Sequence, residues 1–109
     1  MVRTEDQIRK IIETYIKYIE NEIKVDRVIL FGSYANATAT ENSDLDIAIA
    51  SPDFSSDYLK EWKRLCRMVW RSGVEPIIEP RPLFPDMDSY MYNEITTSGV
   101  VVYESKDHS

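Results

Sequence analysis

Apolar residues recur at helical spacing near the start of the chain, after a segment of mixed charge. Thr4 and Gln7 stand three residues apart, as in a capping box, which begins a helix by satisfying its free backbone N–H groups. The spacing predicts an amphipathic helix from about Glu5 to Ile23, and we expect its apolar stripe to pack against a sheet. The stripe consists of Ile8, Ile11, Ile12, Tyr15, Ile16, Ile19 and Ile23.

The pattern changes to that of strands between residues 28 and 50. The uninterrupted apolar run Val28–Phe31 is typical of a buried strand, and the segment Ser43–Ala50 alternates between two kinds of side chain. Because successive side chains of a strand point to opposite faces, the second strand has one apolar face and one partly acidic face. The apolar face carries Leu45, Ile47 and Ile49, and the other face carries Asp44, Asp46 and Ala48.

A further helix is expected from about Asp57 to Arg71, after a break at residues 51–53, and Ser72 and Gly73 would close it. Its predicted inward side chains are Leu59, Trp62, Cys66 and Val69. The basic stripe Lys60, Lys63, Arg64, Arg67 and Arg71 is read first as the solvated face of this helix, with an acidic partner or nucleic acid as the alternative.

The last third of the chain is rich in proline. A strand is expected from Val74 to about Glu79, with Pro76 placing part of it at a sheet edge or bulge. The three prolines that follow predict an extended loop. They are Pro80, Pro82 and Pro85.

A helix from Met87 to Ser98 would then end with Gly99 at its C′ position, before a short strand Val100–Glu104. The element order predicts an α/β (α+β) fold, a small mixed sheet with helices packed on it. Residues 1–104 are expected to form a single domain, and residues 105–109 a frayed tail.

Gly32 and Ser33 follow the first predicted strand directly. A glycine at this point allows the backbone to turn sharply and to approach a ligand closely. Ser33 adds a hydroxyl and opens a short segment whose free N–H groups can face phosphate oxygens. The pair therefore predicts an anion cradle.

Asp44 and Asp46 lie on one face of the second strand, about 6.5 Å apart at a rise of ~3.3 Å per residue. Aspartate has a low propensity for strands, and two neighbouring carboxylates repel each other, so both residues are locally unfavourable in this strand. Such violations are expected at functional sites. Oxygen donors at this spacing suit magnesium, which binds carboxylate, phosphate and water oxygens.

The third strand offers two candidates for a third acid, Glu75 and Glu79. Glu79 is preferred because it follows the apolar pair Ile77 and Ile78. If the third strand runs antiparallel to the second, its C-terminal end lies beside Asp44 and Asp46. A surface glutamate beside a proline turn is the alternative for Glu79.

Composition excludes several classes of function. The net charge of −6 argues against direct binding to nucleic acid or to an anionic membrane, so a nucleotide would have to arrive with its metal ion.

Cys66 excludes an internal disulfide and is read as a small core residue in a chain suited to the cytoplasm. The histidine at position 108 falls in the expected tail, so zinc sites and histidine-activated nucleophiles lack their components. No secretion signal or membrane-spanning run is predicted.

The residues Gly32-Ser33, ten further residues, and Asp44-Leu45-Asp46 resemble the signature of the polymerase-β-like nucleotidyltransferase superfamily, and the short length resembles its minimal branch. The likeness extends from about Arg27 to Glu79. The family loop commonly reads Gly-Ser-x-Ala-Arg-Gly, whereas this chain has Asn36 and Ala37 at the last two positions. The resemblance implies the polymerase-β-like palm fold.

The resemblance also implies transfer of a nucleoside monophosphate, AMP from ATP, to an acceptor hydroxyl. Gly32 and Ser33 would bind the nucleotide, and Asp44, Asp46 and Glu79 would be catalytic residues and ligands of two Mg²⁺ ions, with Mn²⁺ as a substitute. A HEPN-type partner protein, with this chain as its antitoxin, follows from the same likeness. The alternative is a catalytically weak module that neutralises such a partner by contact. Oligomeric state stays open.

Overall fold

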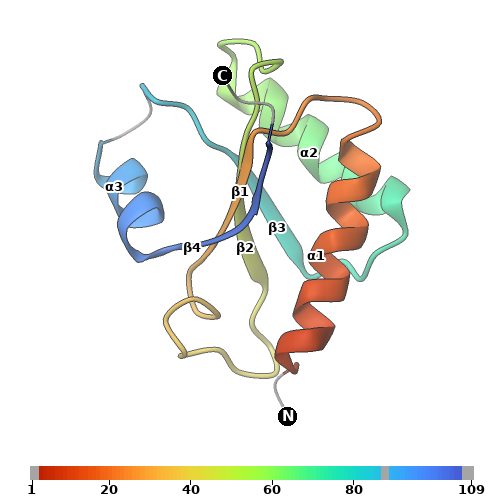
Figure 1. The fold of residues 1–109 in the computed structure, drawn as a ribbon, viewed down its shortest axis with the longest axis vertical. Coiled ribbons are helices and arrows are strands. Elements are labelled where there is room, and N and C mark those ends of the chain that lie inside the picture. The colour runs from red at the N-terminus through yellow and green to blue at the C-terminus, as the bar shows by residue number, and fades with distance from the viewer. Residues whose placement is uncertain (1–2, 87–88, 107–109) are drawn as a thin grey trace.

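The computed structural model describes residues 3–86 and 89–106 of the 109-residue chain. Three helices and four strands make up the described fold, and the strands form one mixed sheet, which confirms the predicted fold class (Figure 1). The elements are α1 (Glu5–Ile19), β1 (Arg27–Phe31), β2 (Leu45–Ala50), α2 (Tyr58–Ser72), β3 (Ile78–Pro82), α3 (Ser89–Ser98) and β4 (Val100–Glu104).

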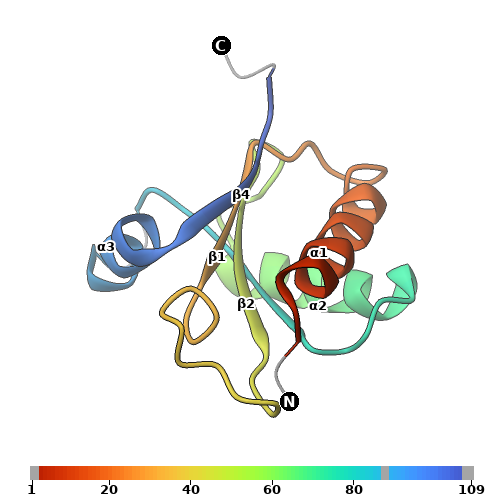
Figure 2. The same ribbon diagram turned by 60° about the horizontal axis from the view of Figure 1, so that its bottom comes forward.

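The strand order across the sheet is β3-β2-β1-β4. β1 runs antiparallel to both β2 and β4, whereas β2 and β3 are parallel. α1 and α2 cover one face of the sheet and α3 lies on the other, as the two ribbon views agree (Figures 1 and 2). The sheet therefore has a face buried by two helices and a face that α3 covers in part.

The larger core lies between the sheet and the helix pair α1 and α2. Alternate strand residues, among them Leu30, Leu45 and Ile47, pack there against the apolar stripe of α1. Tyr15 is completely buried, and its hydroxyl donates a hydrogen bond to the Leu65 carbonyl at 2.9 Å, which ties α1 to α2. A polar tip that finds a partner lets an aromatic side chain fill a core without a desolvation cost.

The first helix begins as predicted but ends earlier. Thr4 and Gln7 form the predicted capping box, and the helix ends at Ile19 instead of Ile23. Ile23 is nevertheless buried, because a turn in which its N–H donates to the Ile19 carbonyl carries it into the core. Periodicity alone does not separate such a turn from one more turn of helix.

The buried face of α2 differs from the prediction. Leu59 was expected inside and is 52% exposed, and Trp62 and Cys66 are only half-buried. The buried positions are Glu61, Leu65, Met68 and Val69. The C-terminal end agrees with the prediction, because Gly73 takes the left-handed conformation that closes the helix.

Ser55 satisfies one oxygen of the buried Glu61 carboxylate, and Arg64 lies 3.8 Å from the other. Its Oε2 accepts hydrogen bonds from the Ser55 N–H at 2.9 Å and from the Ser55 hydroxyl at 2.6 Å. Burial raises the pKa of the Glu61 carboxyl, but the Ser55 hydrogen bonds and the charges of Arg64 and Lys60 outweigh it, so the pKa lies below its usual value. The carboxylate thus fixes the loop before α2 to the first turn of the helix.

The third strand differs from the prediction in position and direction. β3 spans Ile78–Pro82, not Val74–Glu79, and it runs parallel to β2, not antiparallel. The helix between β2 and β3 explains the direction, because it carries the chain back to the end of the sheet at which β2 began. Pro80 and Pro82 lie within the strand, not in the predicted loop. β3 is an edge strand with one neighbour, so residues whose backbone nitrogen points away from β2 need no N–H to donate.

The C-terminal elements follow the prediction closely. β4 is confirmed at Val100–Glu104, and α3 is described from Ser89, so the predicted start at Met87 lies outside the described residues. Gly99 follows α3 but is not left-handed; a side chain there would collide with Ile29 and with the Ile95 carbonyl. The Ser105 N–H donates to the Asp26 carbonyl at 2.8 Å, and residues 107–109 of the predicted tail are not described.

Glu61→Gln should lower the free energy of unfolding at pH 7 by about 1–3 kcal/mol, the range for losing hydrogen bonds to a charged group. Since the folded-state pKa lies below the unfolded value, the stability that the carboxylate contributes is present at neutral pH and is lost as pH falls through the folded pKa. Urea unfolding at pH 7 and in acid should show the difference shrinking. Glu13→Gln, at an exposed position of α1, is the control and should have little effect.

Candidate active site

The candidate site lies where β1 ends and β2 begins, at the lower end of the sheet in Figure 1. Gly32 follows β1 with a φ of 75°, the left-handed region that favours glycine. A Cβ atom on Gly32 would collide with the carboxylate of Asp46, so both the conformation and the close approach require this residue. The predicted turn is present.

The loop after Gly32 forms a short helical turn. The Asn36 N–H donates to the Gly32 carbonyl at 3.0 Å, and the Thr38 N–H donates to the Ser33 carbonyl at 2.9 Å. Within the described residues, no acceptor pairs with the backbone N–H groups of Ser33, Tyr34 and Ala35. The first turn thus leaves N–H groups without an acceptor, and their binding of an anion stays a prediction.

The carboxylates of Asp46 and Glu79 come from adjacent strands. In the parallel ladder Asp46 is the register partner of Glu79, so both side chains leave the same face of the sheet at neighbouring positions. Asp44 stands just before β2, on the chain that leads into Asp46. This is the face on which α3 packs, because Ala48, two residues after Asp46, belongs to the small cluster that includes Ile95 of α3.

The surroundings of Asp46 disfavour its negative charge. Burial raises the pKa of the Asp46 carboxyl, the charges of Glu79 and Asp44 raise it further, and the charge of Arg81 opposes them. The described residues supply no hydrogen bond to this carboxylate. A half-buried acid beside other acids is an arrangement that a bound cation would relieve.

The third acid reaches the site by a different route from the predicted one. Glu79 was expected to reach the site through antiparallel pairing of the two strands. It lies beside Asp46 because β3 is parallel to β2, and Glu79 is the second residue of β3, as Asp46 is of β2. Glu75 lies before β3, and its carboxylate forms an ion pair with Arg3 at 2.7 Å. The geometry thus favours Glu79 over Glu75, and its catalytic role stays a prediction.

No group of three or more His, Cys, Asp or Glu side chains among the described residues is close enough to hold a metal ion as the side chains stand. The acids nevertheless fit a hard cation in chemistry, because they are oxygen donors whose mutual repulsion Arg81 offsets only in part. Phosphate oxygens and water complete such a coordination sphere when only a few ligands come from the protein.

Arg81 is a candidate site residue that the sequence reasoning missed. It pairs with Ala48 in the ladder and shares a face with Glu79, and its charge lowers the pKa of Asp46. The alternation of Ile78, Glu79, Pro80 and Arg81 was the available signal, but assigning the prolines to a loop concealed it. Arg81 thus provides a positive charge near the acids, whereas the loop after Gly32 has the uncharged Asn36 at the position where the family commonly has arginine.

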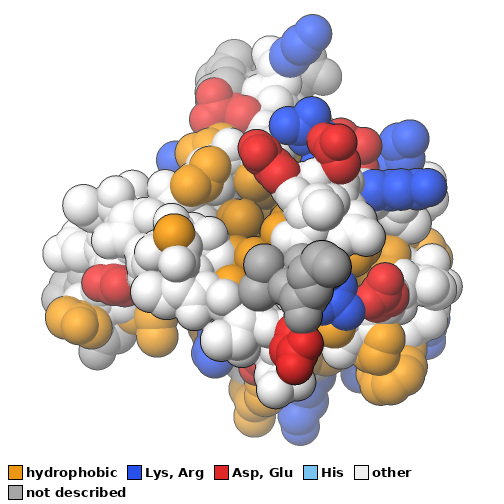
Figure 3. Space-filling model, turned by 90° about the horizontal axis from the view of Figure 1, so that it is seen from below, with side chains coloured by type: hydrophobic (Ala, Val, Ile, Leu, Met, Phe, Trp, Pro, Cys, Tyr) orange, Lys and Arg blue, Asp and Glu red, His pale blue; other side chains and the backbone are white. Residues whose placement is uncertain are grey.

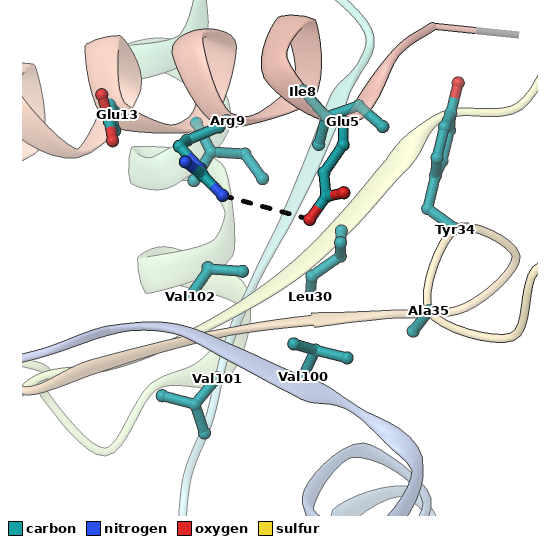
Figure 4. A pocket seen from close by; sticks show the side chains of 11 residues that line it. Glu5, Ile8, Arg9, Glu13, Leu30, Tyr34, Ala35, Val100, Val101 and Val102 are labelled. Carbon is teal, nitrogen blue, oxygen red and sulfur yellow. Dashed lines mark ion pairs between the residues drawn. The ribbon is translucent and has the colours of Figure 1, made fainter.

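A groove of about 580 Å³ lies between α1 and β4, and it is separate from these acids. Ile8, Leu30 and Val100–Val102 line it, and an ion pair joins Arg9 to Glu5 across 4.0 Å (Figure 4). Hydrophobic side chains are visible between acidic and basic ones on the face seen from below (Figure 3). Leu30 belongs to the core under α1 and Asp46 to the opposite face, so we assign the chemistry to the acids and not to this groove.

A mixed sheet that presents a glycine-led turn and neighbouring carboxylates at one end defines a nucleotidyltransferase domain. The chain belongs to the polymerase β nucleotidyltransferase family, whose description reads "Polymerase beta, Nucleotidyltransferase" and whose match extends over residues 13–108. The predicted superfamily is therefore confirmed.

The curated relatives agree with this family. "Putative protein adenylyltransferase MJ0141" of Methanocaldococcus jannaschii is 31% identical over 88% of this chain and 99% of its own length. "Putative protein adenylyltransferase MJ1379" of the same organism is 38% identical over 44% of this chain and 48% of its own length. The chain thus spans nearly all of one relative and about half of the other.

Solved structures share the fold. A crystal structure of "a putative nucleotidyltransferase from Sulfolobus solfataricus" has a TM-score of 0.66 at 16% identity, covering 93% of this chain and 84% of that one. A toxin-antitoxin structure with AMP-PNP has a TM-score of 0.61 at 22% identity, over 86% and 73%. A structure of the tri-AMPylated Shewanella oneidensis HEPN toxin with its MNT antitoxin has a TM-score of 0.56 at 18% identity, over 92% and 73%.

Membrane insertion finds no support in the helices. Within residues 3–86 and 89–106, none of the helices has both the length and the apolar character needed to cross a bilayer.

Ala37 carries backbone strain that can be measured. It has a φ of 59°, a left-handed conformation that costs an L-residue about 1–2 kcal/mol and that glycine adopts freely. Ala37→Gly should therefore raise the free energy of unfolding by roughly 0.5–1 kcal/mol after the added chain entropy of glycine is subtracted. Ala35→Gly, in the same turn but without a positive φ, should lower it; equal effects in urea unfolding would contradict the strain.

Proposed function

We propose that this nucleotidyltransferase domain transfers AMP from Mg-ATP to a hydroxyl group of a partner protein. The observation that carries the proposal is the register pairing of Asp46 with Glu79 beside the turn at Gly32. One end of the sheet thereby combines N–H groups for phosphate oxygens with acids for metal ions.

In this reaction the acceptor hydroxyl oxygen bonds to the α-phosphorus of ATP, the bond from that phosphorus to the β-phosphate oxygen breaks, and pyrophosphate leaves. Gly32 and Ser33 would hold the β- and γ-phosphates. Two Mg²⁺ ions, when bound, neutralise the triphosphate and lower the pKa of the acceptor hydroxyl. Asp44 and Asp46 would hold both ions. Glu79 would bind the second or accept the hydroxyl proton.

The comparisons support a protein as the acceptor and AMP as the group transferred. The curated relatives are named protein adenylyltransferases, and one structural neighbour is an MNT antitoxin with an AMPylated HEPN toxin. We infer that this chain acts in the same way, as a cytoplasmic antitoxin that modifies a HEPN-type partner.

A second function is favoured by the loop. Exposed Asn36 and strained Ala37 stand where the family commonly has arginine and glycine, which removes a phosphate-binding charge and adds cost to the loop conformation. A chain with weak turnover would then neutralise its partner by contact alone. Arg81 places a positive charge near Asp46, which favours catalytic transfer over neutralisation by contact.

Metal dependence is tested by thermal unfolding. Mg²⁺ with ATP should raise the melting temperature more than ATP alone, because binding to the folded state stabilises it by mass action. Asp46→Asn should abolish this synergy while leaving the ligand-free protein at least as stable, since the substitution removes repulsion with Glu79 and Asp44. Asp26→Asn, at the opposite end of the sheet, should retain the synergy. A full metal-dependent shift in Asp46→Asn would mean that the ion binds elsewhere.

Turnover separates Glu79 from Glu75. Glu79→Gln should reduce the rate of pyrophosphate release at least ~10²-fold while ATP affinity changes little, because a group that acts on the acceptor contributes mainly in the transition state. Glu75→Gln breaks only the ion pair with Arg3 and should leave the rate nearly unchanged. The reverse ranking would move the third acid to Glu75, and no effect of either change would favour neutralisation by contact.

A further inference from the structure

The outer face of α2 is basic and carries two exposed apolar side chains. We define this face by Leu59, Lys60, Lys63, Arg67, Trp70 and Arg71, which are all exposed. Trp70 is 74% exposed and Leu59 is 52% exposed. Tryptophan and arginine are the residues most often found at the energetic centre of protein interfaces, so the solvated-face reading leaves Trp70 unexplained.

The charge of this face stands out against the rest of the molecule. α2 carries five of the 13 lysines and arginines of a chain whose net charge is −6, so the remainder is strongly acidic. Lys63, Arg67 and Arg71 form no ion pair with any described residue. Their charges are therefore free to attract an acidic surface.

The basic face is continuous with the candidate active site. A groove of about 180 Å³ separates the exposed edge of β3 from α2. Trp70 and Cys66 line it on the helix side, and Ile78, Glu79 and Pro80 line it on the strand side. Cys66 and Trp70 are one helical turn apart, as are Lys63 and Arg67, so the groove runs directly onto the charged surface. Glu79 thus lines this groove at the sheet edge, while its register partner Asp46 lies beside it on the face where α3 packs.

We propose that the outer face of α2 docks the acceptor protein through an acidic surface of that protein, with an apolar side chain seated against Trp70. The docking site rests on the proposed function, since it places the acceptor hydroxyl at the Glu79 end of the groove. The charges set the orientation and rate of encounter, and Trp70 and Leu59 provide the desolvated anchors.

A protein fits this face better than a nucleic acid does. The net charge of −6 repels a long polyanion wherever it extends beyond the 15-residue helix. An acidic patch on a folded protein is of limited size and is matched by the face alone. Leu59 also offers aliphatic contact, which suits a protein side chain more than a stacked base.

Binding is measured first, with the full chain in EDTA and without nucleotide. One probe is a fluorescein-labelled amphipathic peptide of about 20 residues, a helix of ~30 Å with glutamates on one face and leucines beside them. The other is a labelled single-stranded RNA of about 20 nucleotides. The peptide should bind more tightly than the RNA. The double variant Lys63→Glu with Arg67→Glu should weaken peptide binding at least ~10-fold.

The control double variant is Lys10→Glu with Lys17→Glu, which makes the same change in net charge on the exposed face of α1 and should weaken binding less than ~2-fold. Trp70→Ala should weaken binding at high salt as well, where charges are screened. Tighter binding of the RNA, no binding of the peptide, or equal losses in the two double variants would overturn the proposal. Melting temperatures of all variants establish that they are folded.

Transfer is measured separately, with α-labelled ATP and a nuclease-treated extract of the cells that express the chain. Lys63→Glu with Arg67→Glu should reduce protein labelling at low acceptor concentration and leave unchanged the slow release of pyrophosphate in which water replaces the protein acceptor. Labelling equal to that of the wild type would overturn the docking site while the proposed function stands. If the wild type labels no protein, the proposed function fails, and the peptide measurement still decides the docking site.

Discussion

The parallel pairing of β2 with β3 is the constraint on which the rest of the structure depends. A crossover through α2 returns the chain to the lower end of the sheet, so both strands begin there. Asp46 and Glu79, 33 positions apart in the numbering, thereby become neighbours. The same crossover lays α2 along the exposed edge of β3, which brings a basic helix face next to an acidic site.

The glycine turn and the acids form one unit and not two independent motifs. Gly32 has no side chain because the Asp46 carboxylate occupies the space that a Cβ atom would need. The turn that exposes free N–H groups thus lies directly against the acid whose pKa its neighbours raise. Positive dipole ends and negative carboxylates then lie close together, which suits the metal-bound triphosphate of the proposed function because that ligand carries both signs of charge.

Both edges of the sheet are protected against the addition of another strand. β4 exposes Val100, Val101 and Val102, but a β-bulge interrupts its pairing with β1, a device that discourages the addition of another strand. β3 carries Pro80 and Pro82, which likewise remove outward N–H donors. We therefore place recognition on the side chains of a helix, not on an open strand edge.

The local elements were determined by the sequence alone. Periodicity and turn chemistry predicted the helices, β1, β2 and β4, because each depends on spacing within a few residues. Gly32, Ser33, Asp44 and Asp46 could be singled out for the same reason, since they flank one hairpin and break its local preferences. The family signature rests on this short segment, and the family match over residues 13–108 agrees with it.

Only the tertiary structure decided the direction of β3, the buried face of α2 and the presence of Arg81 beside Asp46. Pro80 and Pro82 signal a loop locally, and they are compatible with a strand only because β3 has one neighbour. Glu61 lies inside and Leu59 outside because Glu61 shares the buried face of α2 with Leu65, Met68 and Val69, and two hydrogen bonds from Ser55 offset part of the cost of burying its carboxylate. These outcomes depend on which distant segments meet, and no window of neighbouring residues contains that information.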